Sequence, residues 1–254
     1  MISSTKIKNY LSSTNKDFKM FKTKLSESEQ EAISNLDINS SNTLNYCGDL
    51  KLLNFNNFFK SIGENNYQTC KSVEQIITKI TKKVLAGFAC EHFWISIRAS
   101  KPNNFFDIPR WHYDGAYFSQ VNSQAKFAVV LKGPGTLVIK KSPKVEKAYE
   151  KIKIQHRKEV NEQFEKQIPK TPNEESQILM KLDDKYRPLY AKAMSKFKIK
   201  QLDKNQGLVF WGGRDTRFSA LHSEPKIDEP RLFISILPST KDNIIEWKNK
   251  MGLK

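Results

Sequence analysis

The spacing of hydrophobic residues predicts one long helix before residue 90. From Ser72 onward, apolar residues recur three or four positions apart, which places them on one face of an α-helix. Ser72 is a favourable N-cap residue and Gln75 follows three positions later, so we expect the helix to begin there with a capping box. Gly87 is expected to end it. The apolar positions of this face are Val73, Ile76, Ile77, Ile80, Val84 and Leu85.

After residue 92 the pattern changes to short, apolar, extended segments. They are rich in β-branched and aromatic residues, and turn-forming sequences such as KGPG (132–135) and DKNQG (203–207) separate them. Strands joined by short turns favour an antiparallel sandwich or barrel. The predicted strands are residues 93–99, 126–131, 136–139, 196–202, 208–211, 218–222 and 231–237.

A polar, helical segment interrupts this β pattern. Ser142 followed by Pro143 is a typical helix start, and an apolar stripe with a spacing near four residues runs from there to Ile168. A second helix start follows at Thr171. We therefore expect an α+β protein whose core is a jelly-roll-like, cupin-like barrel. Its expected parts are a mostly helical N-terminal region (1–92), a β-core in two pieces (93–140 and 197–240), a basic helical insertion (141–196) and a C-terminal tail (241–254).

The chain is strongly basic. Its 43 Lys and Arg residues exceed its 27 Asp and Glu residues, which gives a net charge of +16, and half of this excess lies between residues 140 and 200. Such a charge attracts an acidic or polymeric partner, nucleic acid included. The abundance of Lys, Asn and Ile equally fits a bias of composition without a functional cause. A basic nucleic-acid-binding module therefore stays an alternative interpretation.

Nothing in the sequence predicts secretion or membrane insertion. The first 25 residues lack a continuous apolar segment, and no apolar run approaches the roughly 20 residues of a membrane span. Cys47, Cys70 and Cys90 do not have the spacing of metal ligands, and we expect them to be reduced thiols of an intracellular protein. The expected location is the cytoplasm, without a membrane partner.

The sequence RWHYDGAY (110–117) contains the candidate chemistry. His112 and Asp114 lie two positions apart, so in an extended segment both side chains project to one face while Tyr113 faces the other way. His222 lies at the end of a predicted strand and can supply a third ligand. The two histidines predicted to be structural are His92 and His156. Two imidazoles and one carboxylate on one side of a metal ion form the facial arrangement of non-haem Fe(II) oxygenases.

Arg231 opens the last predicted strand, nine residues after His222. A buried arginine costs free energy unless it meets an anion, and its planar guanidinium pairs with a carboxylate through two hydrogen bonds. Phe233 and Ser235 share its face of the strand, and the intervening residues face the other way. We expect Arg231 to bind the carboxylate of a molecule near the metal.

The order of these segments resembles the double-stranded β-helix of Fe(II)/2-oxoglutarate-dependent oxygenases. The signature of that family is H-x-D/E, a distal histidine and a basic residue on the final strand, which WHYD, LHSEP and RLFISIL supply here. The resemblance implies that His112, Asp114 and His222 hold Fe(II), and that Arg231 pairs with 2-oxoglutarate. It also implies O2 as the oxidant, with succinate and CO2 released. It covers only the predicted β-core and identifies neither the substrate nor the choice between hydroxylation and demethylation.

Other residues are secondary candidates. Ser235, beside Arg231 on the same face, is expected to support cosubstrate binding, and Arg98 and Lys126 are alternative cosubstrate anchors. The predicted pocket walls are Trp111, Tyr117 and Trp211. A cupin-like metalloenzyme that does not use 2-oxoglutarate stays open as a second enzymatic interpretation.

Overall fold

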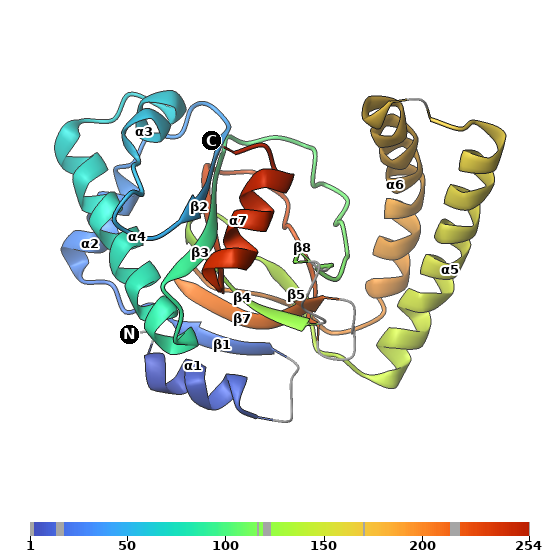
Figure 1. Cartoon of the computed structure of the whole chain (residues 1–254), viewed down its shortest axis with the longest axis horizontal. Helices are drawn as coiled ribbons and strands as arrows, with labels where there is room; N and C mark the ends of the chain where they lie inside the picture. Colours follow the sequence, from blue (N-terminus) through green and yellow to red (C-terminus); the bar gives the residue numbers. More distant parts are fainter. Residues whose placement is uncertain are drawn as a thin grey trace.

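Two antiparallel sheets form the centre of the fold (Figure 1). The computed structural model describes residues 3–13, 18–115, 117–118, 123–169, 171–213 and 219–253. The larger sheet has six strands in the order β1-β7-β4-β9-β3-β2, and the smaller has three in the order β6-β5-β8. The strands are β1 (Phe18–Lys22), β2 (Asn42–Gly48), β3 (His92–Ser100), β4 (Ser123–Lys132), β5 (Leu137–Ile139), β6 (Ile199–Gln201), β7 (Gln206–Gly213), β8 (Leu221–Ser223) and β9 (Arg231–Ser239).

Side chains from both sheets meet in the interior between them. One buried cluster joins Ala128, Leu208 and Phe233 of the larger sheet to Val138 of the smaller one. Successive residues of a strand point to opposite faces, so the strands of the larger sheet bury their remaining side chains on its outer face. The predicted fold class is confirmed: an α+β protein with a double-stranded β-helix core.

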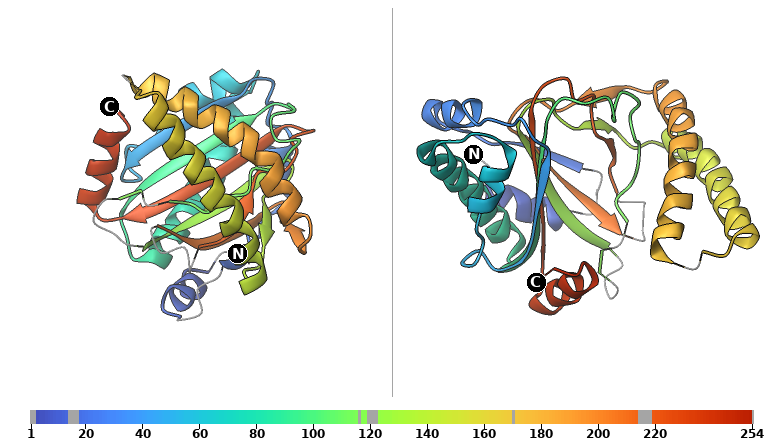
Figure 2. Two further views of the ribbon diagram at one scale, coloured as in Figure 1. Left: turned by 90° about the vertical axis from the view of Figure 1, so that its right-hand side faces the viewer. Right: turned by 90° about the horizontal axis from the view of Figure 1, so that it is seen from above.

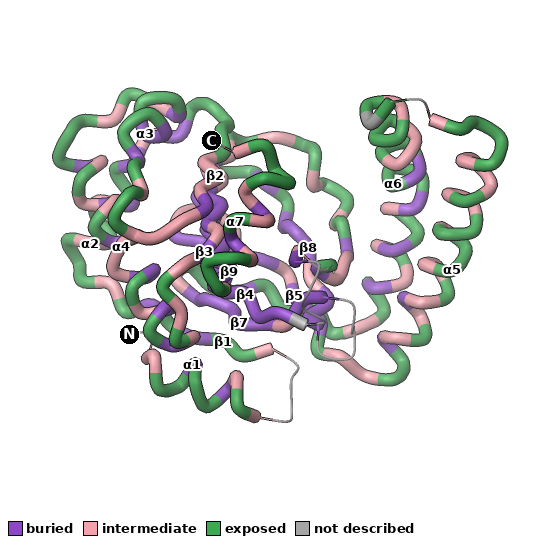
Figure 3. Tube along the Cα trace, in the orientation of Figure 1, coloured by how far each residue is buried: buried purple, intermediate pink, exposed green. Residues whose placement is uncertain are grey.

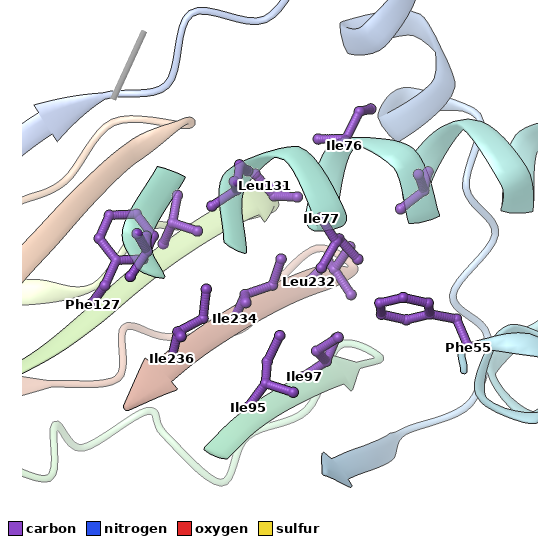
Figure 4. Packing of buried hydrophobic residues seen from close by; sticks show 14 of the residues in the cluster. Phe55, Ile76, Ile77, Ile95, Ile97, Phe127, Leu131, Leu232, Ile234 and Ile236 are labelled. Atoms are coloured by element: carbon purple, nitrogen blue, oxygen red, sulfur yellow. The ribbon is translucent and has the colours of Figure 1, made fainter. Parts of the chain in front are cut away.

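Four helices cover the outer face of the larger sheet (Figures 1 and 3). Ile77 of α4 points toward Ile234 of β9, and both belong with Ile76 and Ile95 to one continuous apolar cluster (Figure 4). Truncating one such buried isoleucine to alanine typically costs about 2–5 kcal/mol of stability, so this layer is the main support of the sheet. The helices are α1 (Ser4–Leu11), α2 (Glu27–Ser34), α3 (Asn56–Ile62) and α4 (Tyr67–Phe88).

The predicted helix after residue 72 exists as α4, but both of its predicted ends are wrong. Asn66 caps the N-terminus instead of Ser72, so the helix begins six residues earlier, in a segment that shows no apolar stripe. Gly87 lies inside the helix, and the left-handed residue that ends it is Ala89. A Cβ atom at Gly87 would lie 2.8 Å from the Cβ of Ile7. Glycine is therefore required there for the close packing of α1 on α4, not for helix termination.

The basic insertion forms a helical hairpin that projects from one side of the β-core (Figure 2). The predicted caps are present, since the side chains of Ser142 and Thr171 each accept a backbone hydrogen bond. His156 stacks on Tyr186 with 4.4 Å between ring centroids, as expected of a packed histidine. Among the described helices, none combines the length and apolar character needed to cross a membrane. The hairpin helices are α5 (Pro143–Lys166) and α6 (Pro172–Met194).

The structure adds elements to both ends of the predicted division of the chain. Region 1–92, predicted to be mostly helical, also contains β1 and β2, which add a strand to each edge of the larger sheet. The alternation of hydrophobic and polar residues is weak in β1 and β2, because these edge strands bury few side chains, chiefly Phe21 in β1 and Cys47 in β2. The C-terminal tail contains a helix, α7 (Lys241–Lys250), which buries Trp247 in an aromatic cluster beside β2 and β3.

Candidate functional site

A backbone bridge brings two histidines together. The N–H of His112 donates to the carbonyl of His222 at 3.0 Å, and the N–H of His222 donates to the carbonyl of His112 at 3.1 Å. His222 lies in the middle of β8, whereas His112 belongs to the irregular segment between β3 and β4. The two ring centroids are 4.3 Å apart. The bridge therefore fixes two imidazoles side by side although they are far apart in the sequence.

Backbone carbonyls set the tautomer of both rings. Nδ1 of His112 lies 2.8 Å from the carbonyl oxygen of Arg110, and Nδ1 of His222 lies 3.0 Å from that of Ala220. A carbonyl oxygen can only accept, so each Nδ1 carries the proton and each Nε2 keeps its lone pair. Hydrogen bonds of this kind orient histidines that ligate metals. Both rings are thus prepared to bind an ion through Nε2.

Asp114 supplies a third donor atom. Its Oδ1 lies 3.7 Å from Nε2 of His112 and 3.6 Å from Nε2 of His222, and the three donors lie within 4.8 Å of one another. Two ligands at about 2.1 Å from one ion and at right angles lie about 3 Å apart, so the group has the size of a mononuclear metal site. Oδ2 accepts a hydrogen bond from Nζ of Lys126 at 2.9 Å, which leaves Oδ1 turned toward the imidazoles.

Burial and neighbouring charges favour the protonation states that bind metal. Burial, assisted by the adjacent His222, lowers the pKa of His112 to about 4. Burial alone would raise the pKa of Asp114, but Lys126 and the two imidazoles outweigh it and hold that pKa well below its usual range. At neutral pH His112 is therefore neutral and Asp114 is a carboxylate. These are the states that metal coordination requires.

The three donors line a cavity of about 340 Å³ inside the β-core. Arg231, the first residue of β9, lies in this cavity with 2% of its surface exposed, and its Nε donates to the carbonyl of Pro134 at 2.9 Å. Burial, assisted by Arg98, lowers the pKa of Arg231 to about 10, so the guanidinium remains charged at neutral pH. Phe233 and Ser235 line the same cavity, while the intervening residues of β9 pack in the outer core.

Three of the secondary candidates, Arg98, Tyr117 and Lys126, also line the cavity. The guanidinium carbons of Arg98 and Arg231 lie 4.5 Å and 5.0 Å from the ring centroid of Phe233. Lys126, which pairs with the carboxylate of Asp114, also donates to the hydroxyl of Tyr117 at 3.1 Å. The two arginines therefore share one aromatic ring, and Lys126 is engaged at Asp114.

Two predicted pocket walls lie elsewhere. Neither Trp111 nor Trp211 is among the described residues that line the cavity. Trp111 packs in the cluster at the base of the hairpin, and Trp211 packs against the outer core. Each directly neighbours a cavity residue, His112 or Phe210, and side chains alternate along extended chain. Tyr113 obeys the same rule, and as predicted it faces away from the metal-binding group to contact a tyrosine of α5.

Sequence reasoning missed two charged residues of the cavity, Arg110 and Glu224. Oε1 of Glu224 lies 3.1 Å from Arg110 and 3.5 Å from Arg98. Burial alone would raise the pKa of Glu224, but His112, Arg110 and Arg98 lower it to about 2. Arg110 precedes His112 by two positions, and Glu224 follows His222 by two. The alternation of extended chain was therefore a usable signal for both.

No protein-family model matches the chain, and no curated protein matches it. A solved prolyl-4-hydroxylase of Pseudomonas putida is 8% identical with a TM-score of 0.42, over 93% of this chain and 98% of that one. A prolyl hydroxylase of Trichoplax adhaerens, in complex with a hypoxia inducible factor peptide fragment, is 10% identical with a TM-score of 0.43, over 96% and 91%. A rice dioxygenase for auxin oxidation is 8% identical with a TM-score of 0.35, over 91% and 78%. Likenesses this distant assign neither a family nor an activity to the chain.

Proposed function

We propose that this chain is an Fe(II)- and 2-oxoglutarate-dependent oxygenase that hydroxylates or demethylates its substrate. The observation that carries the proposal is the grouping of His112, Asp114 and His222, whose donor atoms lie within 4.8 Å of one another. Two imidazoles and one carboxylate on one side of an ion are the ligand set of non-haem Fe(II) oxygenases, and they leave coordination positions open for a cosubstrate and O2.

Arg231 is the proposed anchor of the cosubstrate. In the described part of the chain, no carboxylate forms an ion pair with it, although its charge is buried. A buried charge of this kind gains free energy when an anion arrives. The carboxylate of 2-oxoglutarate remote from its chelating end matches the planar donors of a guanidinium, and Ser235 lies two residues along the same face of β9.

The remaining residues of the site hold the proposed metal ligands in place. When bound, Fe(II) and 2-oxoglutarate would activate O2, the oxidant of a substrate C–H bond, with release of succinate and CO2. Lys126 holds the far oxygen of Asp114, and the carbonyls of Arg110 and Ala220 hold the two imidazoles. These hydrogen bonds fix the ligands before the metal arrives, which raises metal affinity.

Anaerobic titration with Fe(II) and then 2-oxoglutarate tests the proposal. We expect a visible metal-to-ligand charge-transfer absorption that requires both additions and is lost in His222→Ala. His92→Ala is the matched control, because His92 begins β3 and does not line the cavity, and it should keep the absorption. Iron binding without the absorption would overturn the role of 2-oxoglutarate and favour a cupin-like metalloenzyme. A lack of stoichiometric iron binding would overturn the proposal as a whole.

A further inference from the structure

The cavity contains more positive charge than the proposed iron site and cosubstrate require. A divalent iron ion brings two positive charges and 2-oxoglutarate brings two negative ones, so loading the site leaves the charge balance of the cavity unchanged. Among the described residues that line the cavity, that balance is an excess of two positive charges, in a partly enclosed space where charges interact strongly. The cationic side chains are Arg98, Arg110, Lys126 and Arg231, and the carboxylates are Asp114 and Glu224.

Part of this excess lies at Arg98 and Arg110. Glu224 is the carboxylate that pairs with both in the described part of the chain, and both contacts, at 3.5 Å and 3.1 Å, use its Oε1. One carboxylate offsets only one of the two guanidinium charges. Oε2 of Glu224 has no hydrogen-bond partner among the described residues, so this second oxygen does not offset the remaining positive charge.

The two arginines are also accessible from solvent. Their side chains are 38% and 45% exposed, whereas Arg231 is 2% exposed. Each guanidinium has five N–H donors in a planar arrangement, and a shared oxygen of Glu224 uses few of them. Arg231 therefore lies enclosed within the cavity, and Arg98 and Arg110 lie where the cavity opens.

We propose that Arg98 and Arg110 form a second anion subsite, which binds a phosphate or carboxylate group of the substrate. The role of this subsite in catalysis rests on the proposed function, because the bound anionic group would hold the rest of the substrate toward the proposed metal site. Glu224 keeps the two arginines together while the subsite is empty and competes with the incoming anion. The substrate is thus an anionic small molecule or an anionic group of a larger one.

Calorimetric titration of the iron-free protein with inorganic phosphate, and separately with acetate, tests this subsite and distinguishes the two kinds of anion. We expect binding to the unaltered chain and a loss of about tenfold or more in Arg98→Gln and in Arg110→Gln, because each removes charge-assisted hydrogen bonds. The control Arg157→Gln removes one charge from an exposed position on α5 and should retain the affinity within about twofold.

Glu224→Gln provides a second test, because it should increase the affinity for the anion and a misfolded variant would not. Removing the competing carboxylate should tighten anion binding by up to about fivefold, the value of a partly exposed ion pair. Undetectable binding to the unaltered chain, or an affinity in Arg98→Gln and Arg110→Gln equal to that of the unaltered chain, would overturn the inference. A charge-transfer absorption without anion binding would overturn this inference alone. Anion binding without that absorption would overturn the proposed function alone.

Discussion

The two faces of strand β9 differ in chemistry although their residues alternate along one segment. The outer-face residues are Leu232, Ile234 and Ile236, all completely buried against helices (Figure 4). The inner-face residues are Arg231, Phe233 and Ser235, which line the cavity. The outer face contributes burial of apolar area, which stabilises the fold, whereas the inner face keeps a charge out of water at a cost. One strand therefore has one face that stabilises the fold and another that lines the cavity, and substitutions on the two faces should have different effects.

The largest effect is expected at Asp114, which is not part of β9 but lines the same cavity as its inner face. Asp114→Asn removes the anionic ligand, and iron affinity should fall at least about 100-fold, since even the loss of a supporting partner of a ligand costs 10- to 100-fold. The substitution also leaves Lys126 buried without its counter-ion, which should lower the free energy of unfolding by about 3 kcal/mol. Anaerobic Fe(II) titration and urea unfolding measure the two effects.

The double variant Asp114→Asn with Lys126→Met distinguishes the two causes. It removes the unpaired charge and should recover most of the lost stability without recovering iron binding. Unchanged iron affinity in Asp114→Asn would show that the carboxylate is not a ligand.

Adjacent residues of β9 should give opposite results. Ile234→Ala creates a cavity under α4 and should cost about 2–5 kcal/mol of unfolding free energy, while the folded fraction keeps its iron affinity. Ser235→Ala changes the cavity wall and should cost less than about 1.5 kcal/mol. Urea unfolding of both variants checks this, and an equal loss of stability would contradict the division between the two faces.

Substitutions of Arg231 should weaken the binding of 2-oxoglutarate without lowering the stability of the fold. Arg231→Met should weaken 2-oxoglutarate binding by about 10- to 100-fold, the value of hydrogen bonds to a charged group. Because a buried charge is replaced by an apolar side chain of similar length, the free energy of unfolding should stay equal or rise. Arg231→Lys keeps the charge without the planar donors and should bind with intermediate affinity. The charge-transfer titration measures both variants, and unchanged affinity in Arg231→Met would place the anchor elsewhere.

The sequence predicts best the features that depend on one segment alone. Strand β9 and its two faces follow from its own alternation, and His112 and Asp114 face the same way because two positions separate them. Features that depend on distant partners are harder to predict. Glu224 is two positions from His222, but a glutamate next to a proline-rich turn is ordinarily exposed, and only the fold brings Arg98 within 3.5 Å of it. Strand β1 is hard to predict for the same reason, because its extended conformation depends on pairing with the distant strand β7.

A smaller, pH-dependent difference should distinguish the inner face from the outer one. Burial lowers the pKa of His112 from 6.5 to about 4, so between these values the unfolded chain binds a proton that the folded chain does not. The iron-free protein should therefore lose stability as the pH falls from about 6.5 toward 4 and regain it as the pH rises. Glu224, whose pKa is lowered from 4.5 to about 2, adds a loss of stability of the same sign mainly below about pH 4.5, outside the range from pH 6.5 to pH 5. His112→Gln has no such proton to bind, so its urea-unfolding free energy should change less between pH 6.5 and pH 5. Equal slopes in the two proteins would mean that the His112 ring titrates in the folded chain as it does in solvent, and that the cavity does not desolvate it.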